Sequence, residues 1–193
     1  MYKYFLLVSF LFIINSCATK NSDLNMEKSS NNINNNTQSN IILSYVNEAR
    51  AKGAKCAPPA PPLIWNSNLE NAAISHSIDM AANNYLGHDG SGTYLDTGKK
   101  ENGRGSTFID RIKYFGYRIK PHLLVGENIA KTSHKVVGSS KLANNLKRVI
   151  NNWLEEPAHC EILMNSRFKY VGGGAKKTST HTYFTLDFAE EIK

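Results

Sequence analysis

Apolar residues recur at helical spacing in four segments of the chain. The spacing predicts helices that end at Gly53, near Asn84, at Gly116 and at Pro157. In the last and clearest segment, apolar residues fall at i, i+4, i+7, i+8 and i+11, as in an amphipathic helix. They are Leu142, Leu146, Val149, Ile150 and Trp153.

Residues at the ends of these helices suggest how each one starts or stops. Ser67 with Glu70, and Thr107 with Asp110, are spaced as capping boxes, in which a hydroxyl and a carboxylate satisfy free backbone N–H groups. Pro157 is expected to close the fourth helix, with one more helical turn at 161–165.

Shorter apolar and aromatic runs predict strands at 123–130, 168–175 and 181–189, the last two joined by a turn at 176–180. The proline-rich stretch 56–63 excludes helix and predicts an extended connector. Helices outnumber strands and do not alternate with them regularly. The pattern therefore predicts an α+β fold, with helices packed on an antiparallel sheet.

The N-terminal apolar run ends in a pattern that resembles a bacterial lipobox. Phe5 to Ile14 is too short to span a bilayer and has the length of a signal-peptide apolar region. In Ile14-Asn15-Ser16-Cys17, the resemblance implies cleavage after residues 1–16 and acylation of Cys17. A buried N-terminal helix is the alternative.

Asparagine and serine dominate the next segment, so 17–40 is predicted to be a lipidated flexible tether. The folded domain is then 41–193. This organisation predicts an extracytoplasmic protein, lipid-anchored to a bacterial membrane. Because Ala18 rather than Asp follows the acylated cysteine, that membrane would be the outer one in a Gram-negative cell.

Composition and charge limit the classes of partner that we expect. Lys and Arg number 23 against 16 Asp and Glu, for a net charge of +7, and hydrophobic residues make up 41%, an ordinary globular balance. The basic residues are scattered, without the blocks of five or more that mark nucleic-acid arms. We therefore expect no nucleic-acid partner. We also expect the protein to be a monomer. Attraction to anionic lipid or an envelope polymer, and a merely solvated surface, are both open.

Familiar catalytic motifs are absent from the sequence. It has no phosphate-binding glycine loop, HExxH, CxxC or G-x-S-x-G pattern, and 172–174 is a glycine run that indicates a bulge or close packing. What remains is a set of His and Glu residues at element ends: His88, Glu127, Glu155, Glu156 and His159. His76, on the apolar side of a helix, is interpreted as a buried structural residue.

The order of several short motifs carries a family resemblance over about 41–190. They include Leu69-x-x-Ala-Ala-x-x-His-Ser77, Asn84-Tyr-Leu-Gly-His88-Asp-Gly, Gly126-Glu127-Asn128-Ile129-Ala130 and Trp153-Leu-x-x-Pro-x-His159-Cys. The chain resembles a bacterial CAP (SCP-like) domain, related to cysteine-rich secretory proteins, antigen 5 and plant pathogenesis-related proteins. The resemblance implies an α-β-α sandwich with a central antiparallel sheet.

The resemblance also implies a cavity lined by His88, Glu127, Glu156 and His159, with Glu155 as the alternative to Glu156. Two neutral imidazoles, His88 and His159, would be the ligands of a divalent metal such as zinc, and the glutamates could orient them. A solvent-filled cavity without a metal is equally open. Glu127 and Glu156 are the candidate general bases, although no catalytic residue is assigned firmly.

Cys56 and Cys160 remain once Cys17 is assigned to lipidation. An oxidising compartment makes a disulfide plausible, and the resemblance implies the same pairing. Two free buried thiols are the alternative.

These observations leave three functional hypotheses. The first is a binding or envelope-interaction module that takes a lipid, peptide or glycan, which fits the missing nucleophile. The second is a metal-dependent hydrolase that uses the His and Glu cavity. The third is a purely structural lipoprotein. The sequence favours the first and favours no enzymatic activity.

Overall fold

The computed structural model describes residues 38–137 and 141–191. The predicted signal peptide, the predicted lipidation site at Cys17 and most of the predicted tether therefore lie outside the described residues. The first described element is a helix over 38–52, so three residues assigned to the tether are helical. Within the described part of the chain, no helix is long and apolar enough to cross a membrane.

A four-stranded sheet in the order β1-β3-β4-β2 forms the centre of the domain. Its strands are β1 (Ile64–Trp65), β2 (Val125–Ser133), β3 (Tyr170–Lys177) and β4 (His181–Ala189). The three long strands pair antiparallel, as predicted. The two-residue β1 pairs parallel with β3, so the sheet is mixed. Two residues after a proline-rich stretch are too few to show a strand pattern.

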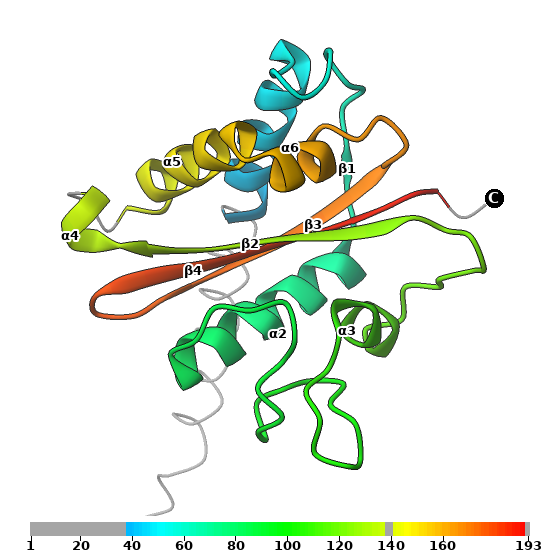
Figure 1. Cartoon of the computed structure of the whole chain (residues 1–193), viewed down its shortest axis with the longest axis vertical. Coiled ribbons are helices and arrows are strands. Elements are labelled where there is room, and N and C mark those ends of the chain that lie inside the picture. Colours follow the sequence, from blue (N-terminus) through cyan, green and yellow to red (C-terminus); the bar gives the residue numbers. More distant parts are fainter. Residues whose placement is uncertain (1–37, 138–140, 192–193) are drawn as a thin grey trace, which may run out of the picture. The chain divides into compact units, whose positions relative to one another are not determined.

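Helices cover both faces of this sheet, which confirms the predicted α+β sandwich (Figure 1). Helix α2 (Ser67–Asn83) packs on one face, and α3 (Phe108–Tyr114) packs against α2. The helix over 38–52, α5 (Leu142–Glu155) and α6 (Pro157–Leu163) lie on the other face. A short α4 (His134–Val137), which the sequence did not predict, follows β2.

The main core lies between the sheet and the helices 38–52 and α5. Every predicted apolar position of α5 except the partly buried Leu142 is buried there, together with residues of β3 and β4. The buried set includes Ile42, Val46, Leu146, Val149, Ile150, Trp153, Val171, Phe184, Leu186 and Phe188. Burial of large apolar side chains on both layers is what holds the sandwich together.

The glycine run in β3 allows α2 to approach the sheet closely. A Cβ at Gly172 would overlap the backbone nitrogen of Glu70, and one at Gly174 would overlap the backbone of Ile74. The register of β3 with β4 runs without interruption, so close packing, rather than a bulge, explains this run.

The predicted helix ends are partly right. Thr107 and Asp110 form the expected capping box of α3. The predicted Ser67–Glu70 box is wrong, because the side chain of Asn66 caps α2 instead and Glu70 accepts a hydrogen bond from Trp65 Nε1 at 2.9 Å. Pro157 closes α5 but also opens α6, where its missing N–H costs nothing.

Cys56 and Cys160 form a disulfide, as predicted. Their Cα atoms are 6.1 Å apart across a sequence separation of 104. The bond joins the proline-rich connector to α6 beside His159. It therefore fixes a short helix that carries one of the candidate site residues.

Candidate functional site

His88 lies in the loop that follows α2, and buried polar groups hold its backbone. Asn84 ends α2 in the left-handed conformation, with φ 52°. His76 Nε2 lies 2.8 Å from the carbonyl oxygen of Gly87, and Arg111 Nη2 donates to the carbonyl of His88 at 2.8 Å. His76 is fully buried, and its predicted structural role is confirmed by this contact. Burial lowers the pKa of His76, so the ring stays neutral.

Two buried aspartates hold the rest of this loop in place through hydrogen bonds. Asp79 accepts hydrogen bonds from Tyr85 Oη at 2.6 Å and from the Ser91 amide at 2.9 Å. Asp96 accepts from the amides of Gly92 and Ser106, each at 2.9 Å. Burial alone would raise the pKa of Asp79, but the hydrogen bonds from Ser91 and Tyr85 outweigh it and lower that pKa. The loop that presents His88 is thus tied to two buried carboxyl groups inside the domain.

Glu127, on β2, joins His88 to Arg111. Its Oε1 lies 2.8 Å from His88 Nδ1, and its Oε2 accepts from Arg111 Nη2 at 2.7 Å. Glu127 and Arg111 are both buried. Burial would raise the pKa of Glu127, but the His88 hydrogen bond and the Arg111 charge lower it, so the carboxylate is ionised. The same hydrogen bond raises the pKa of His88.

Asp187, on β4, lies directly opposite Glu127 in the sheet and was not predicted as a site residue. It is fully buried, and neither carboxyl oxygen has a hydrogen-bond partner among the described residues. Burial and the neighbouring charge of Glu127 raise the pKa of Asp187 well above its usual range. The buried Arg111 therefore pairs with the ionised Glu127, and the environment of Asp187 favours its protonated form.

His159 lies in the first turn of α6 and pairs with Glu156. Its Nδ1 lies 2.7 Å from Glu156 Oε2. Glu155 points elsewhere and accepts from Lys55 Nζ at 2.9 Å. The choice of Glu156 over Glu155 as the partner of His159 therefore agrees with these contacts. The Glu156 side chain is 60% exposed, unlike the buried Glu127.

A groove of about 510 Å³ brings together three of the four predicted residues. It follows the first residues of β2, the edge strand of the sheet, between α3 and α6. His88, Glu127 and His159 line it, whereas Glu156 does not and reaches it only through His159. The rest of the lining is largely apolar: Phe108, Leu124, Val125, Gly126, Ala158, Ile162 and Phe168, with Glu161 and Asn165.

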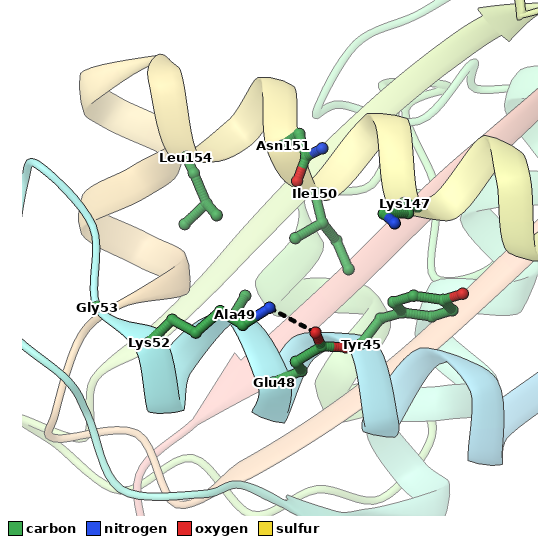
Figure 2. A pocket seen from close by; sticks show the side chains of 9 residues that line it. All are labelled: Tyr45, Glu48, Ala49, Lys52, Gly53, Lys147, Ile150, Asn151 and Leu154. Carbon is green, nitrogen blue, oxygen red and sulfur yellow. Dashed lines mark hydrogen bonds and ion pairs between the residues drawn. The ribbon is translucent and has the colours of Figure 1, made fainter.

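Another hollow, of about 120 Å³, lies between the helix 38–52 and α5 (Figure 2). Tyr45, Lys147 and Leu154 line it, and Glu48 and Lys52 form an ion pair across one turn of its wall. It contains none of the predicted site residues. The candidate chemistry is therefore concentrated in the groove beside β2.

The donor set of the groove does not fit a resident zinc ion. Within residues 38–137 and 141–191, no three His, Cys, Asp or Glu side chains gather as metal ligands. Both oxygens of Glu127 are engaged, and Glu156 and Glu127 each hold a histidine Nδ1. Of the predicted site residues only the two Nε2 atoms remain, and Glu161, also in the lining, is not gathered with them among the described residues, whereas zinc sites in proteins have three or four protein ligands.

The fold is similar to those of two bacterial proteins of known structure. One is an extracellular protein with an SCP domain from Bacillus anthracis, at 24% identity and a TM-score of 0.56. The match covers 81% of this chain and 41% of that chain, so this chain spans about two fifths of the Bacillus protein.

The other is an outer surface protein from Borrelia burgdorferi, also at 24% identity and a TM-score of 0.56, with 79% of this chain and 92% of that chain covered. No curated protein is significantly similar to this chain in sequence. The sequence pattern of the cysteine-rich secretory protein family matches residues 43–188, which contain all of the sheet except Ala189 and every groove residue. The chain therefore belongs to the cysteine-rich secretory protein (CAP) family.

Proposed function

We propose that this protein is a lipid-anchored, extracytoplasmic binding module that holds an amphipathic ligand in the groove beside β2. The lipobox pattern at Cys17 and the secretory family support the location. The names of the two similar structures, one extracellular and one from an outer surface, agree with it. Labelling of cells with a radioactive fatty acid tests the anchor, and an unlabelled protein would contradict it.

The observation that carries the binding proposal is the shared arrangement of the two histidines. A carboxylate only accepts hydrogen bonds, so Glu127 and Glu156 fix the proton of each neutral ring on Nδ1. Nε2 is then the atom left for a ligand, and in the neutral ring it is an acceptor. Both rings line one groove, so they offer two fixed acceptors to the same molecule.

The apolar lining defines the other half of the ligand. Phe108, Ile162 and Phe168 line the same groove as the histidines. A molecule with a hydrocarbon body and a hydroxyl or amine head would satisfy both sets of groups. Among lipid, peptide and glycan, these contacts favour a lipid-like ligand.

The contacts give no support to a hydrolase. Glu127, one candidate general base, is ionised, but both of its oxygens accept hydrogen bonds from fixed partners, His88 and Arg111. Glu156, the other, is bonded to His159 and does not line the groove. A general base must lie within reach of the proton that it removes, with an oxygen that can turn toward it; Glu156 lies outside the groove, and Glu127 is held on both oxygens.

The binding proposal is tested with 1-octanol and octyl methyl ether, which share a hydrocarbon chain but differ in the hydroxyl donor. We expect saturable binding of octanol that is several-fold tighter than that of the ether. In His88→Ala/His159→Ala, the preference disappears while weak binding of both chains remains. Thermal melting checks that the variant folds. Equal affinity of the wild type for both molecules, or no binding up to the solubility limit, would overturn the proposal.

Zinc serves as a separate probe, because His88 and His159 were the predicted metal ligands. With two protein ligands, the wild type is expected to lose zinc on dialysis. Zinc that survives dialysis in the wild type and is lost in His88→Ala/His159→Ala would instead restore the metal site.

A further inference from the structure

A third hollow, separate from the histidine groove, lies between the loop at 94–99 and α3. Its volume is about 670 Å³, and it shares no lining residue with the groove. Four side chains open to solvent line it: Tyr94, Lys99, Lys113 and Tyr114. The function proposed above makes no use of this surface.

Two tyrosine rings are exposed on this surface to an unusual degree. Tyr94 is 86% exposed and Tyr114 is 66% exposed. Among the described residues, only four large hydrophobic side chains are exposed, and these are two of them. Exposed aromatic rings with a polar hydroxyl are typical of recognition surfaces, because they supply contact area at a low cost in conformational entropy.

Three lysines stand against two aspartates at this hollow, because Lys99 and Lys113 line it with Asp96 and Asp110, and Lys100 lies beside Asp110. The carboxylate of Asp96 is used by the amides of Gly92 and Ser106. The carboxylate of Asp110 is used by Thr107 and lies 3.6 Å from Lys100 Nζ. In the described part of the chain, neither Lys99 nor Lys113 lies within ion-pair distance of an acid. The two amines are thus available to an anionic partner.

The hollow is also held in shape before any ligand arrives. Gly98 adopts φ +80°, and its Cα packs against the carbonyl oxygen of Asp110, since a Cβ there would lie 3.3 Å from that oxygen. Thr107 and Asp110 cap α3, and Asp96 anchors the loop that carries Tyr94. A preformed site loses less entropy on binding than a flexible one.

We propose that this Tyr94–Tyr114 hollow binds an anionic glycan, that is, a polysaccharide whose pyranose rings carry carboxylate or sulfate groups. The C–H faces of sugar rings would pack on the two tyrosines, while the anionic groups would pair with Lys99 and Lys113. A lipid surface fits less well, because the lining contains no aliphatic side chain to enter a bilayer.

The test compares a heparin octasaccharide with maltooctaose, a neutral chain of the same number of rings, by calorimetric titration of the folded domain. We expect saturable 1:1 binding of the heparin octasaccharide and at least tenfold weaker binding of maltooctaose. Tyr94→Ala/Tyr114→Ala keeps every charge and is expected to lose at least tenfold in affinity. Both rings are exposed, so this variant should melt at the wild-type temperature.

A matched pair of charge variants separates this site from general attraction. Lys99→Gln/Lys113→Gln removes two charges from the hollow, and Lys176→Gln/Lys177→Gln removes two from the exposed end of β3. Only the first pair should weaken binding. Equal losses in the two pairs, full affinity in Tyr94→Ala/Tyr114→Ala, or no saturable binding at millimolar octasaccharide would each overturn the proposal. Tight binding to anionic vesicles without octasaccharide binding would identify a lipid surface instead.

Discussion

At the scale of single residues, the site is a balance between two buried carboxyl groups and one buried guanidinium. Arg111 neutralises Glu127, which in turn holds the His88 ring. Asp187 has no comparable partner among the described residues, so burial keeps it protonated. The protonation states of Glu127, Asp187 and His88 itself therefore decide whether His88 presents an acceptor or a donor to the groove.

Replacement of Asp187 by Asn tests this balance, because Asn mimics the protonated acid. The pKa of Asp187 is raised in the folded state. Its unfavourable contribution to the free energy of unfolding is therefore smallest below about pH 3.9, its unfolded pKa, and grows as pH rises toward its folded pKa. The Asn variant lacks this cost. Its unfolding free energy relative to wild type should therefore increase as pH rises above the unfolded pKa of about 3.9, by up to about 1.4 kcal/mol per pH unit. Urea unfolding at several pH values measures this, and a pH-independent difference would contradict it.

Glu127→Gln tests the coupling to His88. The hydrogen bond to the Glu127 carboxylate raises the pKa of His88, against the opposing effect of burial, so the variant should titrate at lower pH. His88 is half exposed, and the effect on stability is small. The direction of this effect follows from the raised pKa. The stabilisation by His88 is present below its unfolded pKa of about 6.5 and disappears as pH rises through its folded pKa. NMR titration of His88 measures the shift, with His159 as the internal control. An unchanged His88 with a shifted His159 would refute the assignment.

At the scale of elements, the sequence predicts what depends on local spacing and misses what depends on tertiary contacts. The apolar stripe of α5 and the cap at Thr107 are local, and both are confirmed. Strand β1 exists only because Ile64 meets Tyr170 of β3, far along the chain.

The same distinction applies to the site. His88, Glu127 and His159 were predicted from motif resemblance, and all three line one groove. Arg111 and Asp187 were not, because an arginine in a short helix and an aspartate in an aromatic strand show no local sign of burial. Only the pairing of β2 with β4 shows that Asp187 lies directly opposite Glu127.

The close approach of α2 to β3 gives a sharp element-scale prediction. Gly172→Ala would place a Cβ on the Glu70 backbone and force the helix away from the sheet. We expect a loss of about 2–4 kcal/mol in unfolding free energy, in the range of overpacked core sites. Gly87→Ala is the matched control, because its Cβ would make only ordinary contacts from 3.7 Å. Equal stability of the two variants in urea unfolding would show that this packing is misplaced.

Loss of the disulfide should weaken the domain as a whole. Cys56→Ala/Cys160→Ala opens a loop with a sequence separation of 104, worth roughly 4–5 kcal/mol in the chain-entropy model and less where the unfolded state retains structure. A fall of several degrees in the melting temperature is expected. The reduced wild type should match the variant, and a melting temperature that neither change affects would contradict this role.

At the scale of the whole molecule, the two proposals place two different recognition surfaces on one domain. The groove beside β2 is apolar with two histidine acceptors, and the Tyr94–Tyr114 hollow is aromatic and basic. A tether that ends in a lipid would hold both near a membrane surface.

The most direct test of the central claim is an NMR titration of the histidine side-chain nitrogens with 1-octanol. We expect the Nε2 resonances of His88 and His159 to shift together with one half-saturation concentration, while that of the buried His76 stays unchanged. Nδ1 protonation of both rings should be visible before octanol is added. Shifts of only one histidine, two different half-saturation concentrations, or rings protonated on Nε2 in the neutral state would contradict a shared binding groove.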